Sequence, residues 1–175
     1  MQLFFASRDG HTRRIAQRIA SSLEDCKLAV QVQDLAEHNP APDELGGPVV
    51  LVAAVRYGKH LPQARRFLAM YGKLTAPPPL FFLSVNLTAR KADKRTPEES
   101  PYLRKAIQLY GVKPVLARAI AGCLDYPRYS AFDRQMIRFI MFLTGGPTDP
   151  ATTIEYTDWA EVDDLAKRIA SLATP

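Results

Sequence analysis

The sequence predicts an α/β fold in which an open, parallel, five-stranded sheet is covered by helices on both faces. Apolar, β-prone runs alternate with helical patterns along most of the 175 residues, and such alternation indicates βαβ units. The runs at 48–55 and 80–86 are apolar without alternation, which is typical of parallel strands buried on both faces. Right-handed crossovers then place helices on both sides of the sheet, as a three-layer α/β/α arrangement.

The expected elements follow one another along the chain. Strands are predicted at 2–6, 28–33, 48–55, 80–86 and 115–121, and helices at 12–24, 62–74 and 101–110. In the first helix, Ile15, Ile19 and Leu23 share one face, as a helix that covers a sheet requires. A closing helix begins near Asp158, which has capping-box spacing to Glu161.

The alternation breaks at Gly122. A segment at about 123–150 follows, and only then come a short strand at 152–156 and the closing helix. The simplest interpretation is a fifth strand interrupted by an insertion. We therefore expect residues 1–175 to form one domain, with an inserted helical segment at about 123–150.

The composition is that of a basic globular protein. Lys and Arg outnumber Asp and Glu by 23 to 18, and the formal charge of +5 favours an anionic partner. Cys26 and Cys123 lack metal-ligand spacing, so we expect buried thiols, a reducing compartment and no metal site. The amino terminus lacks the pattern of a secretory signal, and the longest uncharged stretch, 74–89, contains three consecutive prolines. Any membrane association is expected to be peripheral.

The turn from Ser7 to Thr12 lies between the first strand and the first helix, at the carboxyl edge of the predicted sheet. Its hydroxyls, the flexible Gly10 and the free N–H groups of the next helix can hold a phosphate. Asp9 is unfavourable beside a phosphate, so we expect it to cap the helix or accept backbone hydrogen bonds. A capped turn without a ligand is the alternative interpretation.

Two further loops end at the same edge, because the carboxyl ends of parallel strands point one way. They are 54–60 and 84–90. Tyr57 can lie against a flat ring while Gly58 lets the backbone approach it, although a surface tyrosine beside a turn glycine explains the pair equally well. His60 is a candidate general base, and a surface histidine is the alternative that we favour.

Several motifs together resemble a known family. They are Ser7-Arg8-Asp9-Gly10, Arg56-Tyr57-Gly58, Ser84 to Lys91 with Lys94-Arg95-Thr96-Pro97, Tyr126-Pro127-Arg128-Tyr129, Gly145-Gly146 and Tyr156-Thr157-Asp158-Trp159. The turn, the strand count and the interrupted last strand look like long-chain flavodoxins. More narrowly, the motifs are similar to those of the bacterial quinone-dependent protoporphyrinogen IX dehydrogenases, over nearly the whole chain. The resemblance implies a flavodoxin-like fold with strand order 2-1-3-4-5.

The resemblance also implies FMN-dependent, six-electron oxidation of protoporphyrinogen IX in haem biosynthesis, with menaquinone or ubiquinone as acceptor. The flavin carries the chemistry, so no protein nucleophile is required, and the catalytic residues stay unassigned. The implied FMN contacts are Ser7, Arg8, Asp9, Gly10, His11, Thr12, Val55, Arg56, Tyr57, Gly58, Ser84, Val85, Asn86, Leu87, Thr88, Ala89, Arg90, Gly122, Cys123, Leu124 and Asp125.

The two propionates of that substrate need cations near the same edge. The candidates are Arg90, Lys91, Lys94, Arg95 and Arg128, since Arg pairs with carboxylates through two hydrogen bonds. A solvated basic loop explains any one of them equally well.

The inserted stretch 132–143 has a wide apolar arc when projected as a helix. Phe132, Met136, Phe139, Ile140 and Leu143 form its centre, and Asp133 falls inside it. Arg134, Arg138, Phe139 and Phe142 are the expected contacts with an anionic membrane surface. An ordinary buried helix and a homo-oligomer contact are the alternatives.

We therefore expect a cytoplasmic enzyme at the inner face of the cell membrane, with no nucleic-acid partner. A soluble flavodoxin that exchanges single electrons is the alternative from another functional class, but such shuttles are typically acidic. An NAD(P)H:quinone reductase is a third reading, for which no second nucleotide motif was found.

Overall fold

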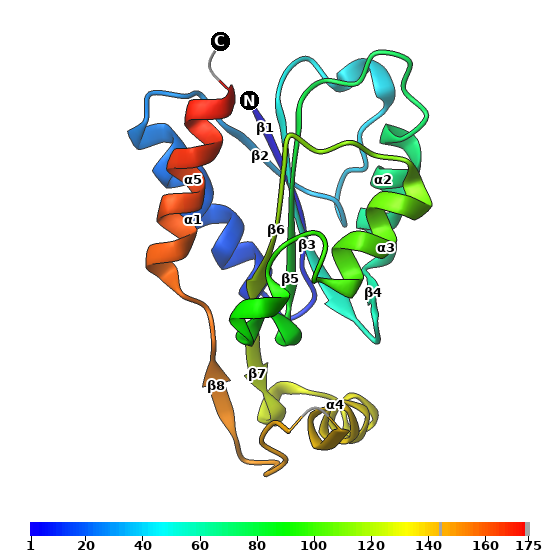
Figure 1. Cartoon of the computed structure of the whole chain (residues 1–175), viewed down its shortest axis with the longest axis vertical. Helices are drawn as coiled ribbons and strands as arrows, with labels where there is room; N and C mark the ends of the chain where they lie inside the picture. The colour runs from blue at the N-terminus through cyan, green and yellow to red at the C-terminus, as the bar shows by residue number, and fades with distance from the viewer. Residues whose placement is uncertain (144, 174–175) are drawn as a thin grey trace.

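The computed structural model describes residues 1–143 and 145–173 and contains the expected parallel sheet. Its five parallel strands run in the order β2-β1-β3-β5-β6 (Figure 1). They are β1 (Gln2–Ala6), β2 (Gln31–Asp34), β3 (Val49–Arg56), β5 (Leu80–Asn86) and β6 (Leu116–Ala121). A short strand, β4 (Lys59–His60), pairs antiparallel with β3. The predicted order 2-1-3-4-5 of the parallel strands is confirmed.

Helices cover both faces of the sheet. On one face lie α1 (His11–Asp25) and α5 (Trp159–Ala173), and on the other α2 (Pro62–Tyr71) and α3 (Pro101–Tyr110), as Figure 1 shows. Alternate residues of β5 point to opposite faces of the sheet. Phe81 packs on the α1–α5 side and Phe82 on the α2–α3 side. Both phenylalanines are fully buried.

The edge strand β2 begins three residues later than predicted. Leu28 packs against the core before the strand starts, and Lys27 adopts a left-handed conformation with φ of 66°. The apolar run therefore marked a core contact in the preceding loop rather than the strand itself. Cys26 is exposed and Cys123 partly exposed, so the expectation of two buried thiols was wrong; Cys26 caps the end of α1, beyond its buried face.

The insertion forms a separate small unit beyond the carboxyl edge. After Gly122 the chain continues as β7 (Cys123–Asp125), followed by α4 (Ala131–Leu143) and β8 (Thr153–Glu155). β8 pairs antiparallel with β7 rather than with the main sheet. Residue 144 of the inserted segment lies outside the described residues. Figure 1 shows α4 at the end of the molecule opposite the two termini.

Short 3-10 helices shape the loops around the carboxyl edge: η2 (Leu87–Arg90), η3 (Ala92–Lys94) and η4 (Tyr126–Arg128), with η1 (Pro42–Glu44) elsewhere. The loop after β5 is tied to α5. Arg95 and Arg118 both pair with the carboxylate of Glu161, at 2.6 and 2.8 Å. Asp158 caps α5, because its carboxylate accepts the N–H groups of Ala160 and Glu161. The side chain of Glu161 binds the two arginines instead of completing the predicted capping box.

None of the helices in the described part of the chain is long and apolar enough to cross a bilayer.

Candidate functional site

The three predicted loops meet around a cavity of about 80 Å³ at the carboxyl edge of the sheet. The turn after β1, the end of β3 and the end of β5 each contribute to its wall, together with Gly122 after β6. It is lined by Arg8, Asp9, His11, Thr12, Ala54, Val55, Arg56, Leu61, Val85, Asn86, Leu87, Gly122, Cys123 and Tyr129. We call it the first cavity.

A second cavity, of about 70 Å³, adjoins the first and shares Val55, Arg56, Asn86 and Leu87 with it. Its wall extends from the β3–β4 turn to α4. The remaining lining residues are Tyr57, Gly58, Thr88, Arg90, Tyr102, Ile137, Ile140 and Met141. A ligand that enters both cavities therefore lies between the sheet edge and the inserted helix.

The turn after β1 leaves the first N–H groups of α1 without a capping side chain. Gly10 is the residue before α1, with φ of 87°, a left-handed conformation that glycine adopts without strain. No side chain caps the helix there. The Oγ of Ser7 instead accepts the N–H of Gly10 at 3.2 Å, which closes the turn. The first turn of α1, with Thr12 buried beside the cavity, therefore favours an anionic ligand.

Asp9 does not cap the helix, so that expectation was wrong. Its carboxylate pairs with the guanidinium of Arg56 at 2.6 Å, across the mouth of the first cavity. The same guanidinium lies 4.8 Å from the ring centre of Tyr129, a cation–π contact. Within the described part of the chain, the buried Nε of Arg56 has no hydrogen-bond partner. An N–H donor therefore borders both cavities without an acceptor.

His11 is held in one tautomer by the segment after β8. Thr157 donates its single hydroxyl proton to the carbonyl of Ala121, at 2.7 Å, because a carbonyl only accepts. The Nε2 of His11, 2.7 Å from the same hydroxyl oxygen, must then be the donor. Burial lowers the pKa of His11, so the ring is neutral and its Nδ1 is an acceptor.

Tyr57 and Gly58 form the two-residue turn between β3 and β4. Arg56 and Lys59 lie opposite each other in the antiparallel β3–β4 pair. The two turn residues between them have positive φ, 51° and 75°, as a type I′ hairpin turn requires. Tyrosine is strained in this region, at a cost of roughly 1–3 kcal/mol. Its side chain is 43% exposed, so the strain is not offset by burial. Such strain at a cavity wall is typical of a ligand-binding loop.

The loop after β5 is organised by Asn86. Its Oδ1 accepts the N–H of Ala89 at 3.0 Å and the hydroxyl of Thr88 at 2.6 Å, so Asn86 caps η2. Ser84 is buried and lies 2.9 Å from the Nε2 of His60. The sequence favoured a surface histidine at position 60, but His60 is buried, so that expectation was wrong. Burial lowers the pKa of His60 to about 4.

The structure brings most of the predicted cofactor contacts to the two cavities, but not all. Ser84, Ala89 and Leu124 are fully buried and line neither cavity, and Ser7 and Gly10 shape the turn behind the wall. Asp125 belongs to the β7–β8 pair and lies 3.9 Å from Arg128.

The predicted cations for a carboxylate substrate differ in their partners and in whether they line a cavity. Arg95 is committed to Glu161, and Lys94 pairs with Asp93 and Glu99. Arg128 is largely exposed and lines neither cavity. Arg90 lines the second cavity and donates to the carbonyl of Leu87 at 3.0 Å. Arg90 and its neighbour Lys91 also line a groove with Glu98 and Glu99.

Sequence reasoning missed several lining residues that come from the insertion. Tyr129 reaches the first cavity, and Ile137, Ile140 and Met141 of α4 line the second. Tyr129 lay within a motif that carried the resemblance, which was the available signal. The α4 contacts depend on where the insertion folds back, which no local pattern reveals.

The inserted helix buries one face and exposes the other. Asp133, Ile137 and Met141 are buried. At the start of the helix the hydroxyl of Ser130 donates to the carboxylate of Asp133 and accepts the backbone N–H of Asp133. Phe132, Phe139 and Phe142 are 70%, 59% and 73% exposed. Arg134 and Arg138 lie along the helix but donate to backbone carbonyls of the insertion, those of Tyr126 and Thr148. The predicted apolar surface is thus present, with its arginines partly engaged.

Comparison with known proteins assigns a family. Residues 2–151 match the flavodoxin domain family. The chain is 38% identical over 170 residues to the protoporphyrinogen IX dehydrogenase [quinone] of Escherichia coli strain K12, covering 97% of this chain and 94% of that protein. It is 40% identical over 172 residues to the protein of that name from Leishmania major, covering 97% and 74%.

Solved structures agree on the fold. A flavodoxin from Streptococcus pneumonia TIGR4 superposes with a TM-score of 0.58 at 14% identity, covering 98% of this chain and 97% of that one. The fold, the cavities at the carboxyl edge and the identity along almost the entire chain lead to one assignment. The chain belongs to the flavodoxin domain family and, within it, to the family of the quinone-dependent protoporphyrinogen IX dehydrogenases.

Proposed function

We propose that this protein is an FMN-dependent dehydrogenase that oxidises protoporphyrinogen IX to protoporphyrin IX and passes the electrons to menaquinone or ubiquinone. The observation that carries the proposal is the pair of adjoining cavities between an uncapped helix start and the inserted helix. The relatives that match over most of their length carry the name of this activity.

The residues at the sheet edge fit FMN. The first cavity is small and lies against the uncapped start of α1, which suits a phosphate group rather than a whole nucleotide. The flavin ring then belongs beside the second cavity, with Tyr57 and Gly58 on one side and Asn86 to Thr88 on the other. The unpartnered Nε of Arg56 is a donor for a ligand acceptor at the junction.

The bound flavin supplies the redox chemistry that connects the porphyrinogen to the quinone. The protein residues supply position and electrostatics. Ile137, Ile140 and Met141 form an apolar wall that excludes water from one side of the second cavity. The guanidinium of Arg56 offsets the negative charge of Asp9 at the junction of the two cavities, so that Asp9 repels an anionic ligand less.

His60 does not suit the role of a general base at neutral pH. With a pKa of about 4, His60 holds a proton too weakly, and its Nε2 already contacts Ser84. His11 donates through Nε2 to Thr157, so its Nδ1 is the ring nitrogen that can accept a hydrogen bond or a proton.

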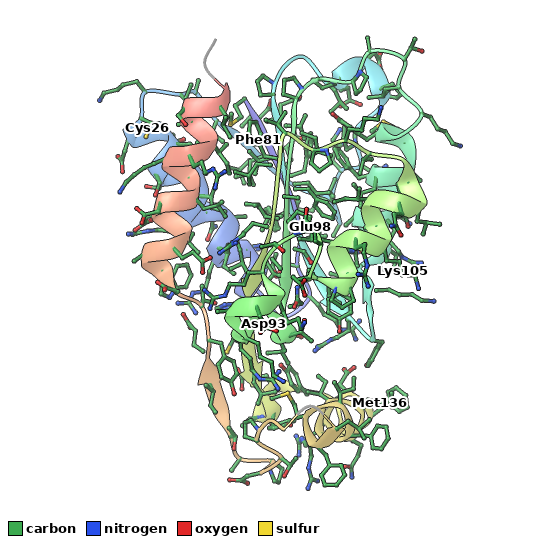
Figure 2. All side chains as sticks on the ribbon, viewed as in Figure 1. Cys26, Phe81, Asp93, Glu98, Lys105 and Met136 are labelled. Atoms are coloured by element: carbon green, nitrogen blue, oxygen red, sulfur yellow. The ribbon has the colours of Figure 1, made fainter. Side chains whose placement is uncertain are left out.

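The exposed face of α4 supports peripheral docking on the inner face of the cell membrane. Three phenylalanines project from it, and Met136 lies on the same helix (Figure 2). A quinone is dissolved in lipid, and α4 also forms a wall of the second cavity, so docking through α4 brings the reaction site to the lipid surface. A homo-oligomer that covers the same face is the competing explanation.

The proposal is tested by turnover of the FMN-loaded protein under anaerobic conditions, with protoporphyrinogen IX as donor and a water-soluble menaquinone analogue as acceptor. Porphyrin fluorescence is expected to appear only when protein, donor and acceptor are all present. Porphyrin formation at the rate of the protein-free control contradicts the proposal.

A further inference from the structure

A groove that no sequence motif indicated lies between α2 and α3, on the outer side of these helices. Its volume is about 260 Å³, and the β4 hairpin closes one end. It is lined by Gly58, Lys59, His60, Arg65, Tyr102, Lys105, Ala106, Leu109 and Tyr110. At the other end α2 lies close to α3: Gly72, after α2, is so near Tyr110 that a Cβ at this position would overlap the carbonyl oxygen of Tyr110. We call it the α2–α3 groove.

The charges of this groove are all of one sign. Lys59, Arg65 and Lys105 come from three different elements, and no carboxylate lines the groove. None of the three takes part in an ion pair within the described part of the chain. Like charges held together without a counter-ion repel one another, so this arrangement favours an anionic ligand.

Arg65 adds a second, independent observation. Its Nε is buried and has no hydrogen-bond partner in the part of the chain that the structure describes. Buried polar atoms are normally hydrogen-bonded, so an orphaned guanidinium N–H beside the groove indicates an acceptor that the protein does not supply. A carboxylate suits this donor, because guanidinium pairs with it through two parallel hydrogen bonds.

The α2–α3 groove adjoins the proposed flavin site. It shares the lining residues Gly58 and Tyr102 with the second cavity, so the two spaces adjoin beside the β3–β4 turn. Leu109 and the two tyrosines give the groove apolar and aromatic surface next to its cations. Figure 2 shows Lys105 on the side of α3 that faces away from the sheet. A ligand with an anionic edge and a large apolar body can lie in the groove with its apolar part directed toward the second cavity.

The groove beside the loop after β5 is a poorer site for carboxylates. Arg90, Lys91, Lys94 and Arg104 line it, but so do two carboxylates. Lys94 is neutralised by its pairs with Asp93 and Glu99, which also raise its pKa. The α2–α3 groove has three cations and no competing anion, so the balance of charge favours it.

From this geometry we infer that Lys59, Arg65 and Lys105 bind the carboxylates of a large apolar dicarboxylate whose body extends toward the flavin at the second cavity. This inference rests on the proposed function, in which that ligand is the porphyrinogen with its two propionates. The cations then set the orientation of the substrate, with the propionate edge in the groove and the opposite edge directed to the flavin site.

The test is equilibrium binding of protoporphyrin IX, which carries the same propionates but is not oxidised, to the FMN-loaded protein. The double variant Lys59→Glu/Lys105→Glu is compared with Lys27→Glu/Lys167→Glu, which changes the net charge equally on the α1–α5 side. The dissociation constant is expected to rise at least tenfold in the first variant and less than twofold in the second. Both variants should retain FMN as the parent protein does.

Esterification provides the matching change in the ligand. Protoporphyrin IX dimethyl ester should bind the parent protein more weakly than the diacid does, and Lys59→Glu/Lys105→Glu should weaken its binding little further, because the ester carries no carboxylate for the glutamates to repel. Unchanged binding of the diacid by that variant, with the loss found in Lys91→Glu instead, overturns the inference and assigns the propionates to the loop after β5. Failure of the parent protein to oxidise porphyrinogen overturns the proposed function itself, so the two failures are distinguishable.

Discussion

The ring of Tyr57 lies edge-on to the ring of Phe132, with centroids 6.3 Å apart and planes at 65°. The contact joins the strained turn after β3 to the first residues of the inserted helix, which are far apart in sequence. Aromatic pairs of this geometry contribute about 0.5–1.5 kcal/mol beyond the area they bury. The insertion therefore helps to hold the turn that borders the proposed flavin site.

Loss of this contact should weaken cofactor binding. Phe132→Ala is expected to raise the FMN dissociation constant about two- to tenfold, which corresponds to the free energy of one aromatic pair. Quenching of FMN fluorescence measures it. Phe142→Ala is the matched control, because Phe142 is equally exposed but makes no ring contact with Tyr57 in the described structure. Equal effects of the two substitutions would show that the contact plays no part.

The ion pair between Arg56 and Asp9 predicts a non-additive pair of substitutions. Arg56→Met leaves the Asp9 carboxylate unpaired beside the proposed phosphate site, so FMN affinity should fall at least tenfold. Adding Asp9→Asn removes the repulsion and should restore part of the loss, with a coupling free energy of about 0.5–3 kcal/mol. Fluorescence titration of the four proteins gives this coupling. Strictly additive effects contradict the proposed electrostatic role.

Thr12 tests the first cavity directly. It is buried beside the uncapped start of α1, and we expect its hydroxyl to bond the FMN phosphate. Thr12→Val should weaken FMN binding by about 1–3 kcal/mol, the cost of removing a hydrogen bond to a charged group. Thr75→Val, at an exposed position in the loop before β5, serves as the control. Unchanged FMN affinity in Thr12→Val counts against a phosphate at this turn.

His60 should make the fold sensitive to acid. Burial lowers its pKa from 6.5 to about 4, so between these values the unfolded chain binds a proton that the folded chain does not. The free energy of unfolding therefore decreases as the pH falls from 6.5 to 4, by up to about 3 kcal/mol from this group. His60→Gln should flatten the decline in Tm over that window, whereas His38→Gln, at an exposed position, should not. Parallel profiles for parent and His60→Gln contradict this assignment.

The exposed face of α4 predicts binding to anionic vesicles. Phe139→Asp/Phe142→Asp should abolish co-sedimentation with vesicles that contain phosphatidylglycerol, while FMN retention is unchanged, because neither residue lines a cavity. Leu172→Asp, on α5, controls for the loss of an exposed apolar side chain. Retained sedimentation by the double variant, or a change of oligomeric state instead, favours a contact between copies.

The sequence predicted the elements best where local patterns are strongest. The bounds of β1, β5 and α3 agree with the expectation to the residue, because a continuous apolar run or a proline at the helix start marks each end. The converging loops were equally predictable, since parallel strands fix the edge at which they lie. Thr12, Arg56 and Asn86, from three of these loops, line the first cavity together.

The failures share a physical cause, which is contact between residues distant in the chain. Nothing near Arg95 indicates that Glu161, 66 positions later, binds its guanidinium. Asp9 was expected to serve its own turn, but Arg56 from another loop binds it. Likewise, the pairing of β8 with β7 is a register choice that local propensity does not determine.

The most direct test of the central claim is anaerobic mixing of the FMN-loaded protein with protoporphyrinogen IX, followed by addition of a quinone. The account predicts that the porphyrinogen bleaches the flavin absorbance, and that excess quinone then restores it while porphyrin absorbance appears, because the substrate must lose six electrons and each flavin holds two. An oxidised flavin that does not respond to the porphyrinogen, in folded protein that retains FMN, would contradict the account and favour a flavodoxin that only exchanges electrons with other proteins.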